Sequence, residues 1–243
     1  MSLKIEGLSK KFGDHEVIAS LQLEIPSGSF TALVGPSGCG KSTLLRLMAG
    51  LEKPSSGSLK YDTNENDHIG FVFQESQLLP WRSVAENILL PLELQNSSLS
   101  ESEKHGRVQT VLKKVKLEHA GRMYPHELSG GMKMRVSVAR ALISNPSWLF
   151  MDEPFGALDE PTRFEMQDLI KQLWMQENLS VVFVTHSLFE AAFLSERIIM
   201  FGPKLGKITA DQTLKITSTM GEDLRTSQEL NNLVKDLSQR IRA

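Results

Sequence analysis

The sequence contains a glycine-rich stretch whose residue types and spacing suit the binding of a phosphate chain. Residues 35–42 read GPSGCGKS and fit the pattern G-x-x-x-x-G-K-[ST]. Glycines let backbone N–H groups approach phosphate oxygens, Lys41 adds a positive charge, and the Ser42 hydroxyl is suited to binding magnesium. The apolar run 30–34 before this stretch predicts a strand, and the run 43–49 after it predicts a helix. We therefore expect a phosphate loop formed by Gly35, Pro36, Ser37, Gly38, Cys39, Gly40, Lys41, Ser42 and Thr43.

An acidic pair follows a second apolar run. Residues 148–151 are apolar and predict a buried strand, and Asp152 and Glu153 come directly after it. A carboxylate at the end of such a strand can hold Mg²⁺, and its neighbour can polarise an attacking water. We assign Asp152 to the metal and Glu153 to the role of general base. Acid pairs also occur as simple helix caps, so this interpretation depends on the phosphate loop.

The stretch 128–132, LSGGM, predicts a second anion-binding site. Ser129, Gly130 and Gly131 open a predicted helix, and the bare N–H groups of a helix N-terminus attract anions. Hydrolysis of one terminal phosphate does not require two separate phosphate sites in one chain. A head-to-tail dimer explains both sites, because this helix of one subunit then faces the Lys41 loop of the other.

Composition narrows the class of protein. The chain has 243 residues and a formal net charge of -2, so it has no basic excess with which to follow a nucleic-acid backbone. Cys39 is the single cysteine, which excludes an internal disulfide and suits a reducing cytosol. The length suits one large domain or two small ones, with a sizeable core, and we expect no nucleic-acid partner.

The periodicity along the chain predicts an α/β fold. Residues 1–75 are mostly strands and turns, and strands alternate with helices from 146 to 201, which predicts a largely parallel sheet. The block from about 76 to 145 is helical, with predicted N-caps at Ser83 and at Ser98, the latter paired with Glu101 in a capping box. We expect one domain spanning 1–243: a core of 1–75 and 146–210, an inserted helical subdomain, and a tail helix within about 211–243. The polar stretch 61–68 predicts a tight hairpin loop.

These motifs together resemble the ATP-binding cassette (ABC) ATPases, over roughly residues 3–205. The phosphate loop matches the Walker A motif, residues 72–75 the Q-loop, and residues 128–132 the signature motif. Asp152 and Glu153 match the end of Walker B, residues 157–159 the D-loop, and His186 the switch histidine. The resemblance implies a P-loop NTPase (RecA-like) core with an N-terminal antiparallel β-subdomain and an inserted α-helical subdomain.

The resemblance also implies site roles, with ATP and Mg²⁺ as cofactors. Lys41, Gln74, Glu153 and His186 would be catalytic, and Ser42, Gln74 and Asp152 would hold the metal. The nucleotide would contact the whole phosphate loop and further positions in both subunits. These further positions are Phe12, Val17, Gln74, Ser129, Gly130, Gly131 and Asp159. Phe12 would stack on adenine with Val17 beside it, although a place in the ordinary core is the alternative for Phe12.

Three stretches (78–88, 152–159 and 190–194) look most like bacterial importers of the nitrate, sulfonate and taurine type. That branch implies transmembrane permease subunits, indirect contact with an extracytoplasmic substrate-binding protein, dimerisation on ATP binding, and a peripheral position at the cytoplasmic face of the inner membrane. The apolar residues 78–81 fit a permease-docking surface or a satellite core. Both hold if Leu78 points inward and Trp81 outward.

Two other functional classes stay open at this point. One is a non-transport ABC ATPase acting on a nucleic-acid or protein complex, but this chain has one cassette and no basic tract. The other is an assembly protein that binds nucleotide without turnover, against which Glu153 and His186 argue. The chain departs from the common family pattern at Met134 and Ser187, which stand where many relatives have glutamine and aspartate.

Overall fold

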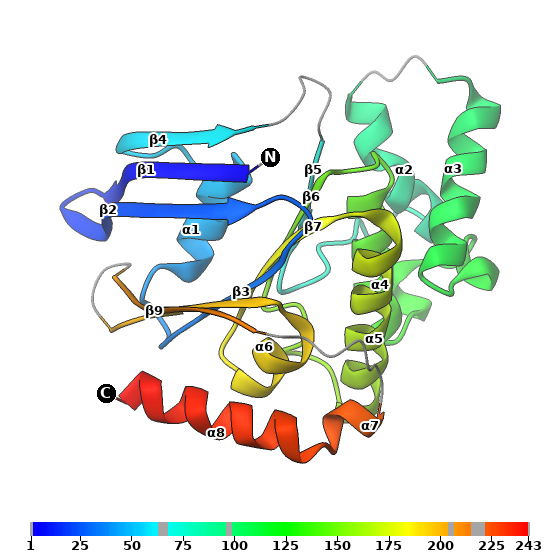
Figure 1. The fold of residues 1–243 in the computed structure, drawn as a ribbon. Helices are drawn as coiled ribbons and strands as arrows, with labels where there is room; N and C mark the ends of the chain where they lie inside the picture. The colour runs from blue at the N-terminus through cyan, green and yellow to red at the C-terminus, as the bar shows by residue number, and fades with distance from the viewer. Residues whose placement is uncertain (1, 63–67, 96–98, 204–206, 215–221, 243) are drawn as a thin grey trace.

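The structure, a computed structural model, describes residues 2–62, 68–95, 99–203, 207–214 and 222–242. A sheet of order β5-β6-β7-β3-β8-β9 crosses the molecule, and a separate antiparallel sheet of order β2-β1-β4 lies beside it (Figure 1). The strands are β1 (Ser2–Phe12), β2 (His15–Pro26), β3 (Phe30–Val34), β4 (Ser56–Tyr61), β5 (Ile69–Val72), β6 (Trp148–Asp152), β7 (Ser180–Thr185), β8 (Arg197–Phe201) and β9 (Ile208–Thr213).

The helices form two groups at different ends of the molecule. Helices α2 and α3 lie at the end remote from the antiparallel sheet, while α1 lies beneath that sheet and α8 runs along the opposite edge (Figure 1). The helices are α1 (Lys41–Met48), α2 (Val84–Leu94), α3 (Glu101–Lys114), α4 (Gly130–Leu142), α5 (Glu160–Glu177), α6 (Leu188–Leu194), α7 (Glu222–Arg225) and α8 (Gln228–Arg242), with short 3₁₀ turns η1 (Glu118–Ala120) and η2 (Pro125–Glu127).

The larger sheet is parallel from β5 to β8, and only β9 runs antiparallel, against β8. Its central strands β3, β6 and β7 are buried on both faces. On β7, Val181 and Phe183 pack with α4 and α5, whereas Val182 and Val184 pack with α1 and the antiparallel sheet. This period-two alternation between two cores explains why the strands are continuous apolar runs. The predicted P-loop NTPase fold with an antiparallel β-subdomain and separate helices is confirmed.

Local capping explains where the helical block begins. The Ser83 hydroxyl accepts a hydrogen bond from the Glu86 N–H, and the Glu86 carboxylate accepts one from the Ser83 N–H. The predicted cap of α2 is therefore confirmed. The second capping box is displaced by two residues, because Ser100 and Glu103 form it. The predicted partner Ser98 lies outside the described residues.

The region after β8 differs from the prediction. A further strand, β9, adds antiparallel to β8 and was not predicted, because its pattern is polar and only half-buried.

The hairpin predicted over 61–68 is wrong. Strands β4 and β5 belong to different sheets, so they do not form a hairpin. Residues 63–67 of that segment lie outside the described part of the chain.

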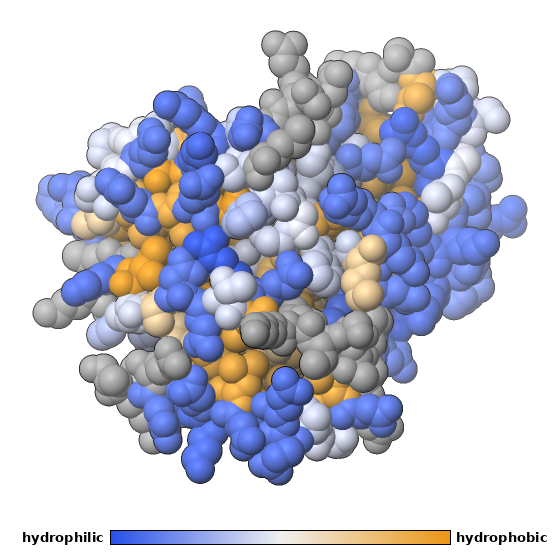
Figure 2. Space-filling view, viewed as in Figure 1, coloured by the Kyte–Doolittle hydropathy of each residue, from blue (hydrophilic) through white to orange (hydrophobic). Residues whose placement is uncertain are grey.

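The last helix covers α6. Leu224, Leu230 and Leu237 are buried in the core that contains α6, and hydrophobic atoms are visible just above α8 on the face shown in Figure 2. Arg225 of α7 donates to both carboxylate oxygens of Asp168 on α5, at 2.9 and 3.1 Å. The tail is thus attached through apolar packing and through a paired charge.

We expect Leu237→Ala to lower the free energy of unfolding by about 2–4 kcal/mol, because it leaves a cavity under α8. Urea denaturation followed by circular dichroism measures the change. Lys235→Ala, on the exposed face of the same helix, is the control and should alter stability by less than about 0.5 kcal/mol. Equal stability of both variants would contradict the docking of α8.

Candidate functional site

The glycine-rich loop leaves the end of β3 and enters α1. Gly38 and Gly40 have φ angles of 78° and 96°, in the region that favours glycine. A Cβ atom on Gly40 would lie 3.0 Å from the Val17 carbonyl oxygen. Gly40 therefore meets two constraints at once: the backbone turn, and close contact with β2 of the antiparallel sheet.

Lys41 occupies the interior of this loop. Its side chain is buried, and its ammonium group donates to the carbonyl oxygens of Gly35 and Pro36, both at 2.8 Å. These neutral acceptors hold the charge at the loop. Phosphate oxygens carry negative charge and make stronger hydrogen bonds with ammonium groups, so the loop keeps a cation ready for an anionic ligand.

The first turn of α1 meets the end of β6. The Ser42 hydroxyl donates to Asp152 Oδ1 at 2.7 Å, and Arg46 Nη2 lies 3.7 Å from Asp152 Oδ2. A hydroxyl and a carboxylate are the hard oxygen ligands that Mg²⁺ prefers. The donor set therefore fits the predicted metal. Gln74, the third predicted metal residue, is exposed just beyond β5.

Glu153 adopts a constrained backbone conformation. Its φ angle is 45°, which is unusual for a residue other than glycine. Its N–H donates to the Val184 carbonyl oxygen at 3.1 Å, and its Oε2 lies 3.6 Å from His186 Nδ1. The end of β6 is thereby joined to the end of β7, and the two predicted catalytic side chains are brought together.

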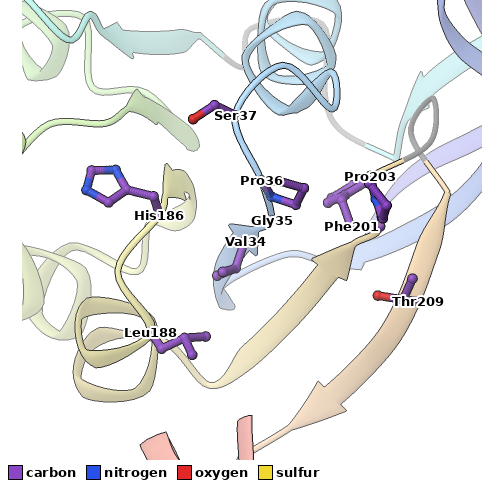
Figure 3. Close-up of a pocket in the computed structure, with 10 residues that line it drawn as sticks. Val34, Gly35, Pro36, Ser37, His186, Leu188, Phe201, Pro203 and Thr209 are labelled. Atoms are coloured by element: carbon purple, nitrogen blue, oxygen red, sulfur yellow. The ribbon is translucent and has the colours of Figure 1, made fainter. Parts of the chain in front are cut away.

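Two cavities lie against the phosphate loop. One, of about 320 Å³, is lined by Glu153 and by Val17, Ser37, Gly38, Gly40, Lys41, Ser42 and Thr43. The other, of about 680 Å³, lies between the loop, the His186 segment and the β8–β9 connection. Figure 3 shows His186 and Ser37 near one another at one end of this second cavity and Thr209 at the other. The sheet thus places the predicted base and the switch histidine around the loop.

Phe12 and Gln74 are among the predicted nucleotide contacts that do not line the smaller cavity. Phe12 ends β1 with 49% of its surface exposed, and the Lys10 ammonium lies 4.6 Å from its ring centroid. Its alternative placement in the core is wrong. Gln74 is exposed and does not line this cavity either. Val17, the predicted neighbour of adenine, does line the cavity.

The signature residues do not line either cavity at this chain's own phosphate loop. Ser129 caps α4 by accepting from the Met132 N–H at 3.2 Å, and both Ser129 and Gly130 are exposed. A Cβ on Gly130 would meet open space, whereas one on Gly131 would lie 2.2 Å from Thr162 Cγ2 of α5. Gly130 thus leaves room for an external ligand, and Gly131 is required for packing within the chain. Asp159 occupies the N-cap position of α5 without a side-chain capping hydrogen bond and is also exposed.

The structure gives reasons for the two departures from the family pattern. Met134 is buried and packs in the core of the helical block. Ser187 caps α6 by accepting from the Glu190 N–H at 3.3 Å, a role that aspartate also fills.

A polar cluster next to the switch histidine was not predicted from the sequence. Thr185, Glu190 and Arg163 are joined by hydrogen bonding and charge. One signal was available, namely an acidic residue within the otherwise apolar helix 188–194. A buried acid of this kind needs a partner.

A parallel sheet with a glycine loop after β3, a histidine after the adjacent strand β7 and two acids at the end of the next strand, β6, defines a P-loop ATPase. The family model described as ABC transporter matches residues 18–156. The chain belongs to this family; it is an ATPase that uses ATP and Mg²⁺.

Curated relatives agree along most of the chain. The aliphatic sulfonates import ATP-binding protein SsuB 1 of Mesorhizobium japonicum is 42% identical over 208 residues, 85% of this chain and 77% of that protein. The SsuB protein of Pectobacterium atrosepticum is 43% identical over 218 residues, 88% of this chain and 78% of that protein.

Solved structures show the same fold. The ATP-binding cassette MJ0796, described as a dimer in a post-hydrolysis state bound to ADP and Pi, has a TM-score of 0.76 and 33% identity, covering 88% of this chain and all of that one. The cbiO1 protein from Clostridium perfringens, part of the ABC transporter complex cbiONQ, has a TM-score of 0.77 and 29% identity, covering 87% and 88%.

We expect Gly131→Ala to destabilise the protein by about 1–3 kcal/mol, because its methyl group would overlap Thr162. Thermal denaturation measures the effect. Gly130→Ala, in the same helical turn, should keep the wild-type melting temperature. Thr162→Ala in the Gly131→Ala background should restore most of the loss, and failure to restore it would contradict this packing explanation.

Proposed function

We propose that this chain is the ATP-hydrolysing subunit of a membrane importer of the nitrate, sulfonate and taurine type, and that it works as a head-to-tail dimer. One observation carries the proposal. Lys41 and Ser42 follow β3, Asp152 and Glu153 end β6 and follow it, and His186 follows β7, so the groups needed for phosphoryl transfer converge at one edge of the sheet.

The proposed roles follow from position and chemistry. Lys41 and the loop N–H groups bind the phosphates, and Glu153 orients the attacking water. His186, which lies 3.6 Å from Glu153, contacts the terminal phosphate. Ser42 and Asp152 hold Mg²⁺, whose charge stabilises the β- and γ-phosphate oxygens. Gln74 reports occupancy of the site, and Phe12 stacks on adenine beside Val17.

The second half of each site comes from the partner subunit. Ser129 and Gly130 are exposed at the N-terminus of α4, and the Asp159 carboxylate is exposed ahead of α5. With Gly131, these groups contact the nucleotide held by the other subunit. ATP then stabilises the closed dimer most strongly, and its hydrolysis weakens the contact, which is the differential affinity that a switch requires.

The membrane partner is proposed from the relatives and from one surface. The relatives named above are import proteins for aliphatic sulfonates, which supports a permease as the direct partner and a substrate-binding protein as an indirect one. Among the described residues, no helix combines the length and apolar character needed to cross a membrane. We place the chain as a peripheral subunit at the cytoplasmic face of the membrane, with no nucleic-acid partner.

The docking surface is centred on Trp81. Leu78 packs against the core, whereas Trp81 is 72% exposed. The predicted arrangement of one inward and one outward side chain is therefore confirmed. A large exposed indole is the kind of group that buries well against a short helix of a partner.

We expect Glu153→Gln to lower kcat for ATP hydrolysis by about 10²–10⁴-fold, because the general base is lost while the phosphate loop stays intact. The same variant should accumulate as an ATP-bound dimer in gel filtration with Mg-ATP. If it binds ATP and elutes only as a monomer, the shared-site dimer is wrong.

We expect Trp81→Ala to lose recruitment to membranes that contain the permease, while the isolated protein keeps its ATPase rate. Co-sedimentation with permease vesicles measures recruitment. Leu94→Ala removes a similarly exposed apolar side chain of the same helical block, 75% exposed, and is the matched control. Unchanged recruitment of the Trp81 variant would contradict the docking surface.

A further inference from the structure

Glu190 is a buried acid directly behind the switch histidine. It lies in the first turn of α6 with 7% of its surface exposed. Its N–H donates to the hydroxyl of Ser187, and its carboxylate accepts a hydrogen bond from the hydroxyl of Thr185. Both partners are neighbours of His186 in the chain, so Glu190 is bound to the segment on each side of it.

The hydroxyl of Thr185 connects these groups in a defined direction. It donates its single hydrogen to Glu190 and accepts the N–H of Ser187 at 3.0 Å. A hydroxyl has one donor and two acceptor positions. The Thr185 hydroxyl therefore donates its hydrogen to the carboxylate and uses a lone pair to accept the N–H of Ser187. The turn that carries His186 is thereby closed around a hydroxyl that Glu190 orients.

Arg163 extends the cluster toward the D-loop, residues 157–159. Its Nη2 donates to the Leu158 carbonyl oxygen at 2.8 Å, and its Nε lies 4.0 Å from Glu190 Oε1. Within the described part of the chain, the buried Nε has no hydrogen-bond partner. A buried donor of this kind favours a small movement that brings it to an acceptor, and the acceptor that faces it is the free oxygen of Glu190.

We propose that Glu190 is a positioning residue that couples the D-loop to the switch histidine, through Arg163 on one side and Thr185 on the other. Movement of the D-loop when two subunits close brings Arg163 onto Glu190 and fixes the turn that presents His186. This inference rests on the proposed function, because it assigns His186 to the terminal phosphate and the D-loop to the dimer interface.

The electrostatic setting agrees with this role. Burial raises the pKa of Glu190 above its ordinary value, while the Thr185 hydroxyl and the charges of Arg163 and His186 oppose this shift, and Glu153 adds to it. The Thr185 hydroxyl and the Arg163 charge therefore both favour the ionised carboxylate. A closer guanidinium would favour ionisation and strengthen the bond to Thr185.

The test is steady-state ATP hydrolysis by the full chain with Mg²⁺. We expect Glu190→Gln, which keeps the side-chain volume, to lower kcat by about tenfold with an unchanged KM for ATP. Thr185→Val should lower kcat in the same way, and Thr185→Ser, which keeps the hydroxyl, should retain it. Glu177→Gln removes an ion pair with Lys114 at the other end of α5 and should keep the wild-type kcat.

Double variants separate positioning from general damage. If Glu190 acts through His186, then Glu190→Gln adds no further loss to His186→Ala, and Arg163→Met adds none to Glu190→Gln. Multiplying losses, or wild-type kcat in Glu190→Gln, would overturn the inference. If Glu190→Gln does not fold, as judged by its thermal denaturation, equal kcat values of Thr185→Val and Thr185→Ser would overturn it instead.

These variants also distinguish the proposed function from the coupling. Full activity of His186→Ala, or no hydrolysis by the wild-type chain, would reject the proposed function itself. Loss of activity in His186→Ala together with wild-type kcat in Glu190→Gln would reject the coupling alone.

Discussion

The hydrogen bond between Ser42 and Asp152 depends on the parallel register of the central sheet, and the catalytic arrangement depends on both. It joins residues 110 positions apart in the chain. The strands β3, β7 and β6 are neighbours and run in the same direction, so their carboxyl ends reach one edge together. The sheet register thus brings the glycine loop, the acidic pair and the switch histidine to one edge, and the Ser42–Asp152 hydrogen bond joins the first two.

The helical block is tied to this edge by two contacts that restrict its movement. Gly131 lies directly against Thr162, where even a methyl group has no room. Arg140 of α4 donates to the carbonyl oxygens of Ser76 and Gln77, both at 2.8 Å. The segment after Gln74 is thus hydrogen-bonded to the signature helix.

Much of the fold and site follows from local patterns. Alternating or continuous apolar runs predicted the parallel strands, because the central strands β3, β6 and β7 are buried on both faces. The Ser83 cap uses neighbours in sequence. The errors concern pairings that no local pattern records. The half-polar β9 forms because β8 offers an open edge, and β4 and β5 separate because each pairs with a strand distant in the chain.

The sequence by itself determined the chemistry: a lysine and a serine in a glycine loop, two acids after a strand, and a histidine after another. Only the tertiary structure decided how these groups are held. It brought Arg163 and the D-loop to Glu190, and it set the different surroundings of Gly130 and Gly131. The physical reason is that residue type fixes which bonds a group can make, whereas packing of distant elements fixes which partner comes within reach.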